Sequence, residues 1–456
     1  MDISSVISLR RMIFGLCVLV ALAVLATSGG EAASPKKHLL VVSVTAGFRH
    51  SSIALGEKII NELGEKNGKW DVDYVRSDED MARMMTASAL KKYDAVVFNN
   101  TSGELPLPDR KAFLDFVRNG KAFVGIHAAT DSFRDQGDKP GWKEYINMVG
   151  AQFVTHGAQS DVSCIVEDRN HPATRHLPAT WTVREEVYQF KDFSRDRMRG
   201  LLSLDKHPNT QEPGDFPIAW CRNEGRGRVF YTALGHREDL MEGELYRKHL
   251  EGGILWALGL EKGSAEPVKP QPLRGMDRKQ GFRPLFDGVS LDGWHARDEG
   301  RTPWTVQNGM LVMGHGGADL ISNRQFRNFV IRYDYQVPKG GNSGVYLRGR
   351  YEIQVLDDYD SKTADIHGNG SVYGAIKPSS FASRPAGEWQ TVEATMIGDR
   401  ITVVLNGVTI VDNQAVTGVT GGAIDGNTEV PGPIMLQGDH GPIAYRNIRV
   451  KTLPGR

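Results

Sequence analysis

The spacing of hydrophobic positions changes midway along the chain and divides it into two regions. In the first region, continuous apolar runs such as LLVVSVT (39–45), DAVVFNN (94–100) and KAFVGIH (121–127) alternate with segments of helical periodicity, the last at 244–259. Apolar strands separated by amphipathic helices are typical of a parallel sheet covered on both faces. The pattern therefore predicts an α/β domain over residues 36–260.

In the second region the hydrophobic period falls to two. Segments such as FVIRYDYQV (329–337) and RITVVLNGVTIVD (400–412) alternate apolar and polar residues, with no amphipathic helix between them. Asn406-Gly407 is a strong hairpin signal because both residues tolerate positive φ. Many short strands with Gly- and Pro-rich turns predict an all-β sandwich over residues 281–454.

Two segments fall outside these predicted domains. Residues 261–280 are rich in Pro, Lys and Gly and form the predicted linker. Residues 1–33 place Arg10 and Arg11 before an apolar run and a small-residue stretch, which is the order of a signal peptide. The run is short for a membrane span, although a retained N-terminal anchor is the alternative. We therefore expect an exported protein, periplasmic or extracellular, with no stable membrane span after signal cleavage.

Charge and cysteine content exclude several classes of protein. The 456 residues carry 55 Lys plus Arg and 55 Asp plus Glu, so a nucleic-acid partner is not expected, and a small neutral ligand is favoured. Cys17 lies in the predicted signal, and no CxxC or Cys/His cluster indicates a zinc ribbon. For Cys164 and Cys221 we favour two buried free thiols over a disulfide. No nucleotide cofactor is predicted.

Histidines follow three of the apolar strands in the first region. His127 occupies a Gly-x-His-x-Ala elbow where related folds carry a nucleophilic Ser or Cys, and His50 and His236 follow two other strands. Ligands bind at the carboxyl ends of strands in open parallel sheets, so the three side chains can converge on one crevice. The alternative is that each histidine caps a helix or contacts a loop carbonyl.

Several motifs of the first region carry a family resemblance. The segments VVSVTAGFRHSS, GIHAATDSF, GAQFVTHG, REEVYQF and GRGRVFYTALGH resemble the trehalose-utilisation (ThuA-like) family across residues 36–259. The resemblance implies a flavodoxin-like, glutamine-amidotransferase-like fold whose elbow lacks the nucleophilic cysteine, and a role in sugar metabolism without an assigned reaction. Thiol acyl-transfer chemistry is therefore not expected, and His127 is a candidate base or metal ligand that Glu185, Glu186 or Tyr188 can join. The candidate site of this domain comprises His50, His127, Glu186 and His236.

The second region carries a different resemblance. The segments LFDGVSLDGWH, GNSGVYLRGRYEIQVLD, PAGEWQTVEA and IMLQGDHGPIAYRNIRV resemble the 3-keto-disaccharide hydrolase family over residues 282–453. The resemblance implies a concanavalin A-like jelly-roll sandwich and cleavage of glycosides already oxidised at C3. The ketone acidifies the C2 proton, so a base can remove it, the C1 substituent leaves by β-elimination, and water adds to the enone. Such a site needs a base, a group that stabilises the enolate, and an acid for the leaving oxygen.

Several candidate residues for this chemistry lie on two neighbouring segments. Glu352 and Gln354 share a strand face, and a three-residue loop through GRY would place Arg348 opposite Glu352 and Tyr346 opposite Gln354. Glu352 is the predicted base or metal-bound carboxylate, Arg348 or a bound divalent cation is predicted to stabilise the enolate, and His440 is the predicted acid for the leaving group. The predicted substrate contacts are Asn342, Tyr346, Gln354, Gln437 and Tyr373.

A bound cation and two alternative interpretations remain for the second region. A divalent cation (Ca²⁺, Mg²⁺ or Mn²⁺) would suit the oxygen ligands of Glu352, Gln354 and Asp357. The polar strand face equally fits a solvated outer surface. The sandwich fold is also shared with lectins, so the alternative function is a carbohydrate-binding module attached to the first domain. A small carbohydrate is the expected partner in either case.

Overall fold

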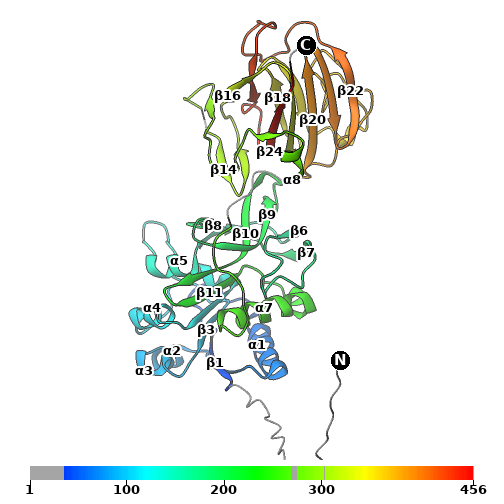
Figure 1. Cartoon of the computed structure of the whole chain (residues 1–456). Helices are drawn as coiled ribbons and strands as arrows, with labels where there is room; N and C mark the ends of the chain where they lie inside the picture. The colour runs from blue at the N-terminus through cyan, green and yellow to red at the C-terminus, as the bar shows by residue number, and fades with distance from the viewer. Residues whose placement is uncertain (1–34, 269–274, 302, 455–456) are drawn as a thin grey trace, which may run out of the picture. The chain divides into compact units, whose positions relative to one another are not determined.

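The computed structural model describes residues 35–268, 275–301 and 303–454, so the predicted signal peptide lies outside the described residues, as does part of the predicted linker. The first domain contains a nine-stranded sheet in the order β2-β1-β3-β4-β11-β10-β9-β6-β7 (Figure 1). Its parallel strands are β1 (Lys37–Val42), β2 (Trp70–Val75), β3 (Ala95–Asn99), β4 (Ala122–Ile126) and β11 (Gly227–Thr232). The predicted α/β fold is confirmed.

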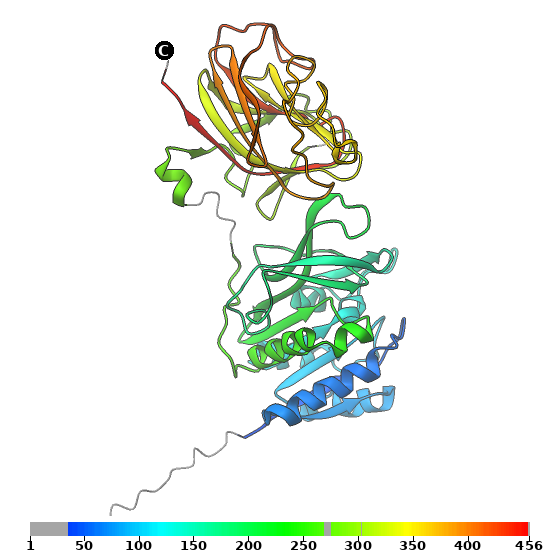
Figure 2. The ribbon, with the colours of Figure 1, turned by 90° about the vertical axis from the view of Figure 1, so that its right-hand side faces the viewer.

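Helices cover both faces of the parallel part, as the apolar strands predict. Leu39 and Val41 of β1 pack toward the face covered by α1 (Ile53–Asn67) and α7 (Glu244–Ala257), which lie side by side in Figures 1 and 2. Leu40 and Val42 belong to the core of the opposite face. The helices of that face are α2 (Asp78–Met84), α3 (Ala87–Leu90), α4 (Arg110–Arg118) and α5 (Lys143–Val149).

The sheet continues beyond the parallel strands into an antiparallel extension that the sequence pattern does not predict. The extension consists of β10 (Pro213–Glu224), β9 (Arg199–Lys206), β6 (Ser160–Val166) and β7 (Thr180–Glu185). Along β7 buried and exposed residues alternate, because one face of the extension lies in the core and the other meets solvent. A separate pair, β5 (Gln152–His156) with β8 (Tyr188–Lys191), lies outside this sheet. The remaining helical segments are η1 (His127–Asp131) and α6 (Glu238–Glu242).

The second domain is an antiparallel β-sandwich, as predicted. One sheet has the order β14-β15-β24-β17-β20-β21-β22, with β12 paired to β24, and the other has the order β13-β16-β23-β18-β19. The strands of the first sheet are β12 (Arg283–Pro284), β14 (Thr305–Gln307), β15 (Met310–Met313), β17 (Phe329–Gln336), β20 (Gln390–Ile397), β21 (Arg400–Leu405), β22 (Val408–Ala415) and β24 (Ile443–Thr452). Those of the second are β13 (Trp294–Ala296), β16 (Leu320–Phe326), β18 (Asn342–Leu347), β19 (Tyr351–Leu356) and β23 (Gly432–Leu436). The helical turns are α8 (Gly275–Lys279) and η2 (Tyr359–Ser361).

The inward-facing residues of both sheets form the core of the sandwich. Ile331 and Tyr333 of β17 and Ile353 and Val355 of β19 are almost fully buried in it. The side chains at intervening positions of β19, Glu352 and Gln354, lie on the opposite face of their sheet. The alternation therefore separates the sandwich core from the polar row that the sequence predicts as functional.

Two further expectations concern cysteines and membrane spans. Cys164 and Cys221 are both buried and free, so the prediction of two thiols is confirmed. Burial raises the pKa of the Cys164 thiol to about 12 and that of the Cys221 thiol still further, which leaves both thiols protonated and unreactive near neutral pH. None of the helices in the described ranges is both long enough and apolar enough to cross a membrane.

Candidate functional sites

His127 lies at the centre of the candidate site in the first domain. Its backbone adopts a left-handed conformation (φ 43°) directly after β4, which turns the side chain out of the sheet edge. The Nδ1 atom lies 2.7 Å from the carbonyl oxygen of Ala233. Because that oxygen can only accept, Nδ1 carries the proton and Nε2 is left with its lone pair.

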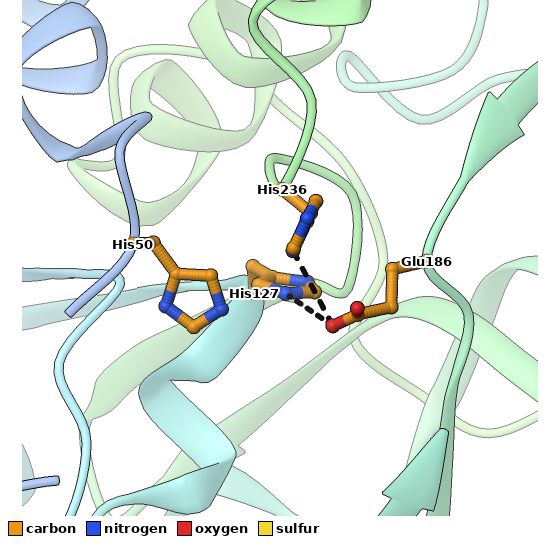
Figure 3. Close-up of side chains that lie close together, drawn as sticks. All are labelled: His50, His127, Glu186 and His236. Atoms are coloured by element: carbon orange, nitrogen blue, oxygen red, sulfur yellow. Dashed lines mark ion pairs between the residues drawn. The ribbon is translucent and has the colours of Figure 1, made fainter. Parts of the chain in front are cut away.

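The structure brings all four candidate residues of this domain together. His50 follows β1, His236 follows β11, and Glu186 follows β7, so the parallel strands and the antiparallel extension both contribute (Figure 3). One ligand atom of each residue lies within 4.8 Å of those of the others. Glu186 Oε1 lies 3.3 Å from His236 Nδ1 and 3.7 Å from His127 Nε2. The convergence expected from the strand ends is therefore observed.

Burial and mutual contact shape the charges of this cluster. Burial, together with the neighbouring His127 and His236, lowers the pKa of His50 to about 3. Burial opposes ionisation of Glu186, but contacts with His127 and His236 hold its pKa well below the usual range. Contact with Glu186 raises the pKa of His236. The cluster thus combines an ionised carboxylate, that of Glu186, with the neutral imidazole of His50.

Neighbouring residues hold the cluster in place. The fully buried Glu185 accepts hydrogen bonds from the backbone N–H groups of Gly235 (3.0 Å) and His236 (3.2 Å). The ring of Tyr188 packs on His127 at 4.1 Å between centroids. His156 Nδ1 lies 3.3 Å from Glu186 Oε2 and was not among the sequence candidates, although the GAQFVTHG motif contains it. Glu185 and Tyr188 therefore position the cluster, and His156 extends it.

A cavity of about 440 Å³ opens beside this cluster. His50, Glu186 and His236 form one part of its wall. The remaining wall combines aromatic rings with polar groups, namely Phe48, Phe153, Tyr188, Asp131, Arg134 and Gln136. Its size and mixed lining are typical of a small-molecule site.

In the second domain, Glu352 is the residue with the most perturbed carboxyl group. It is 4% exposed on β19. Burial raises the pKa of this carboxyl to about 7. Tyr346 and His440 lower the pKa, whereas the negative charges of Asp319 and Asp439 raise it. A carboxyl group that titrates near neutral pH can accept or donate a proton under working conditions.

The neighbouring strand shapes the surroundings of Glu352. Tyr346 of β18 lies directly opposite Glu352, and its hydroxyl donates to the carbonyl oxygen of Gly421 at 2.9 Å. Gly344 of the same strand lies opposite Gln354, and a Cβ atom added there would come within 2.3 Å of Glu352 Oε1. The carboxyl group therefore lies across the bare backbone of Gly344, beside the Tyr346 ring.

The predicted pairing of Arg348 with Glu352 is wrong. Leu347 pairs with Tyr351, so the connecting loop is residues 348–350 rather than 349–351, and the register shifts by two residues. Arg348 adopts φ 54° in this loop, and its guanidinium donates to the backbone carbonyls of Arg327 and Gly398. Its hydrogen bonds hold loops together, and it does not face the Glu352 carboxyl group.

The other residues predicted for this site each make their own contacts. The backbone N–H of Gln437 donates to Gly344 at 2.9 Å, which brings the 437–440 loop to β18. His440, 47% exposed in its side chain, contacts the Asp439 carboxylate. Asn342 begins β18 with a buried Oδ1 atom that has no partner, whereas Tyr373 packs against His367.

Two of the three predicted oxygen ligands, Asp357 and Gln354, make contacts of their own within the protein. Asp357 accepts a hydrogen bond from the N–H of Gly340 at 2.9 Å and lies 3.8 Å from the Lys339 amine. The Gln354 Oε1 atom accepts from the N–H of Val355 at 3.2 Å. A cation bound by Glu352, Gln354 and Asp357 stays a prediction.

The protein therefore has two parts. The first is an α/β domain with a histidine–carboxylate cluster, and the second is a β-sandwich with a buried carboxyl group whose pKa is raised to about 7. Residues 38–257 match the family model described as trehalose utilisation (ThuA). Residues 281–451 match the model of the 3-keto-alpha-glucoside-1,2-lyase-like domain. The fusion of these two domains, expected from the sequence motifs, is confirmed.

Individual proteins resemble parts of the chain. A 3-keto-disaccharide hydrolase of Bacteroides thetaiotaomicron is 28% identical over 145 residues, an alignment that covers 24% of this chain and 50% of that protein. The chain thus spans about half the length of this curated relative. A ThuA-like protein from Bacteroides uniformis is 24% identical with a TM-score of 0.42, covering 53% of this chain and 98% of that structure. A Parabacteroides distasonis structure, described as a putative glycosyl hydrolase, is 29% identical with a TM-score of 0.34, and the match covers 38% of this chain and 84% of that structure.

Proposed function

We propose that the protein is a carbohydrate-active enzyme that cleaves 3-keto-glycosides at the Glu352 site of the sandwich. The observation that carries the proposal is a carboxyl group 4% exposed, with its pKa raised to about 7, in a domain that matches the 3-keto-alpha-glucoside-1,2-lyase-like model. A general base works best when its pKa lies near the operating pH. The related protein of Bacteroides thetaiotaomicron is a 3-keto-disaccharide hydrolase.

The proposed reaction begins with proton abstraction. The Glu352 carboxylate removes the C2 proton, and the electron pair of the C–H bond moves into an enolate that places negative charge on the C3 oxygen. The Tyr346 hydroxyl, opposite Glu352 on β18, donates to that charge after it releases the Gly421 carbonyl to which it donates in the free protein. This role replaces the one that the sequence assigned to Arg348, whose guanidinium is engaged with loop carbonyls.

The enolate then expels the C1 substituent. The C1–O bond breaks, a double bond forms between C1 and C2, and the leaving oxygen takes a proton from His440 on the 437–440 loop. Water next adds to C1 of the enone: its oxygen forms the new C1–O bond, one of its protons returns to His440, and the proton held by Glu352 returns to C2. The sum of these steps is hydrolysis, with the ketone at C3 regenerated.

The experiment that tests the proposal compares oxidised and unoxidised substrates. The purified protein is incubated with 3-keto-trehalose and, separately, with trehalose, each with and without a chelator, and the release of glucose is followed. We expect glucose from the keto-sugar alone. Loss of activity with chelator would support the proposed divalent cation. No release from either sugar would contradict the proposal, and binding without turnover would favour the carbohydrate-binding module.

We also propose export of the protein, on the basis of Arg10, Arg11 and the apolar and small residues that follow them. N-terminal sequencing of the protein purified from its native cells checks this point. A mature chain that begins near residue 34 in the periplasmic or extracellular fraction would support export, whereas an intact N-terminus in the membrane fraction would favour a retained anchor.

A further inference from the structure

The histidine–carboxylate cluster of the α/β domain contains buried polar atoms that have no hydrogen-bond partner among the residues that the structure describes. They include His50 Nδ1 and His127 Nε2, in side chains 5% and 0% exposed. Buried polar atoms in folded proteins are nearly always paired, since leaving one unpaired costs roughly 1–3 kcal/mol. His236 Nδ1 is a third such atom, and it and His127 Nε2 lie 3.3 and 3.7 Å from the same atom, Glu186 Oε1, so one ligand at that point can contact both.

The spacing of the ligand atoms fits a metal ion. Tetrahedral coordination with metal–nitrogen and metal–oxygen bonds of about 2.1 Å separates neighbouring ligand atoms by about 3.4 Å. The observed separations from Glu186 Oε1 are 3.3 Å to His236 Nδ1 and 3.7 Å to His127 Nε2. The four ligand atoms lie within 4.8 Å of one another, so the cluster has to contract around an ion for all four to bind it.

The surroundings of the cluster also fit a metal centre. The Nδ1–H of His127 donates to the Ala233 carbonyl, which fixes the tautomer that leaves Nε2 free to coordinate. Glu185 holds the backbone of His236 through two hydrogen bonds from the 235–236 segment. Metal-binding histidines are usually oriented by contacts of this kind, because a fixed imidazole loses less entropy on coordination.

We propose that His50, His127, His236 and Glu186 bind a divalent first-row transition metal, with Zn²⁺ as the best-matched ion. Three imidazole nitrogens and one carboxylate favour Zn²⁺ over Ca²⁺ or Mg²⁺, which prefer all-oxygen ligands. This site is separate from Glu352 and from the oxygen-ligand set predicted for the sandwich.

The site faces the cavity of about 440 Å³, to which His50, Glu186 and His236 contribute. A metal ion held there is accessible from the cavity side, so a water molecule or an oxygen of a small polar ligand can join the coordination sphere. The aromatic and polar wall formed by Phe153, Tyr188 and Arg134 suits a sugar-sized molecule with several oxygens. The centre thus has the open side of a catalytic metal site rather than the closed shell of a structural one.

Metal content and spectroscopy test the proposal without relying on catalytic activity. The full-length protein is stripped with a chelator, dialysed, and titrated with ZnCl2, while bound metal is measured by plasma emission and the melting temperature by circular dichroism. We expect one zinc ion per chain and a rise in melting temperature, because ligands that bind the folded state stabilise it. Cobalt(II) in place of zinc should give visible bands of a four- or five-coordinate nitrogen–oxygen site.

Matched variants show whether the metal is bound by these residues. Glu186→Gln retains the shape of the side chain but removes its charge, and should weaken Zn²⁺ binding at least roughly 100-fold, since even loss of a supporting contact costs 10–100-fold. His236→Gln should have a comparable effect. His176→Gln is the control, because His176 contacts the Leu245 carbonyl and lies outside the cluster. It should bind zinc like the unaltered protein.

Two results would overturn the proposal. One is an unaltered protein that binds no stoichiometric zinc or cobalt while it remains folded by circular dichroism. The other is a folded Glu186→Gln variant whose zinc affinity equals that of the His176→Gln control. If a cluster variant fails to fold, the cobalt spectrum of the unaltered protein still decides the question. If the protein shows no activity at the Glu352 site, these measurements of metal binding still apply, because none of them depends on catalysis.

Discussion

Replacing Glu352 with glutamine separates the chemistry of its carboxyl group from its packing. Glutamine keeps the size of the side chain and an acceptor oxygen, but it cannot take a proton from carbon. General acid–base groups contribute about 10²–10⁴-fold to rate, so Glu352→Gln should lower kcat on 3-keto-trehalose by that factor. Binding of the keto-sugar should remain, because the strand, Tyr346 and Gly344 are unchanged.

The pH profile of the unaltered enzyme should report the same carboxyl group. The pKa of Glu352 is raised to about 7, so only about one tenth of the molecules carry the ionised base at pH 6. We therefore expect kcat/KM to fall about tenfold per pH unit below pH 7 and to level off above it. A base with the ordinary pKa of Glu would instead give a flat profile down to about pH 5.

The raised pKa also predicts an effect on stability, with a definite sign. Because the pKa of folded Glu352 lies above its unfolded value of 4.5, the folded state binds the proton more tightly. The penalty for ionising Glu352 is absent below pH 4.5, grows between pH 4.5 and 7, and is complete above pH 7. A shift of this size corresponds to a penalty on the order of 3 kcal/mol. Glu352→Gln should therefore be more stable than the unaltered protein at pH 8 and equally stable near pH 4.5.

Urea unfolding at pH 4.5 and pH 8 measures this difference, and initial rates of glucose release measure the activity. Glu299→Gln provides the control, since Glu299 is an exposed carboxylate of the same domain and should change neither quantity. An inactive variant with no stability gain at pH 8 would show that the carboxyl group is not desolvated. A variant with full activity would refute the assignment of Glu352 as the base.

Three further substitutions test the surroundings of Glu352. Tyr346→Phe removes the hydroxyl opposite Glu352 and should lower kcat about 10- to 100-fold with little change in KM, which steady-state kinetics measures. Gly344→Ala places a methyl group 2.3 Å from Glu352 Oε1 and should lower kcat/KM at least about tenfold by displacing the base. Arg348→Met leaves the carbonyls of Arg327 and Gly398 without their donor and should reduce the free energy of unfolding by on the order of 2 kcal/mol. The kcat of folded Arg348→Met should stay unchanged, and a large loss of kcat would return Arg348 to a catalytic role.

The sequence predicted those residues of the first-domain cluster that follow the parallel strands. His50, His127 and His236 each follow an apolar strand, and parallel strands place their carboxyl ends at one edge of the sheet. Glu186 follows β7 of the antiparallel extension, whose alternating pattern does not reveal its neighbour in the sheet. It entered the prediction only through the REEVYQF motif. His156 reaches the cluster from β5, outside the main sheet, so strand periodicity could not place it.

In the sandwich, alternation predicted the faces of the strands but not their register. Glu352 and Gln354 share a face because strand side chains alternate, and this holds for any loop between β18 and β19. A register shift of two residues keeps every side chain on its face while changing its partner. The loop begins at Arg348 and Gly349, with φ values of 54° and 67°, and this choice of turn placed Tyr346 opposite Glu352. A left-handed arginine in a turn is not a signal that the sequence pattern provides.

The backbone at His127 has a consequence for how this domain could change its chemistry. The left-handed elbow after β4 sets the direction of the side chain whichever residue occupies it, and amidotransferase-like folds use this geometry to present a thiol. His127→Cys would place sulfur beside an imidazole and a carboxylate, those of His236 and Glu186. That is the composition of a thiol nucleophile with its base and orienting group. A single residue therefore separates the proposed metal-binding arrangement from the constituents of covalent catalysis on the same scaffold.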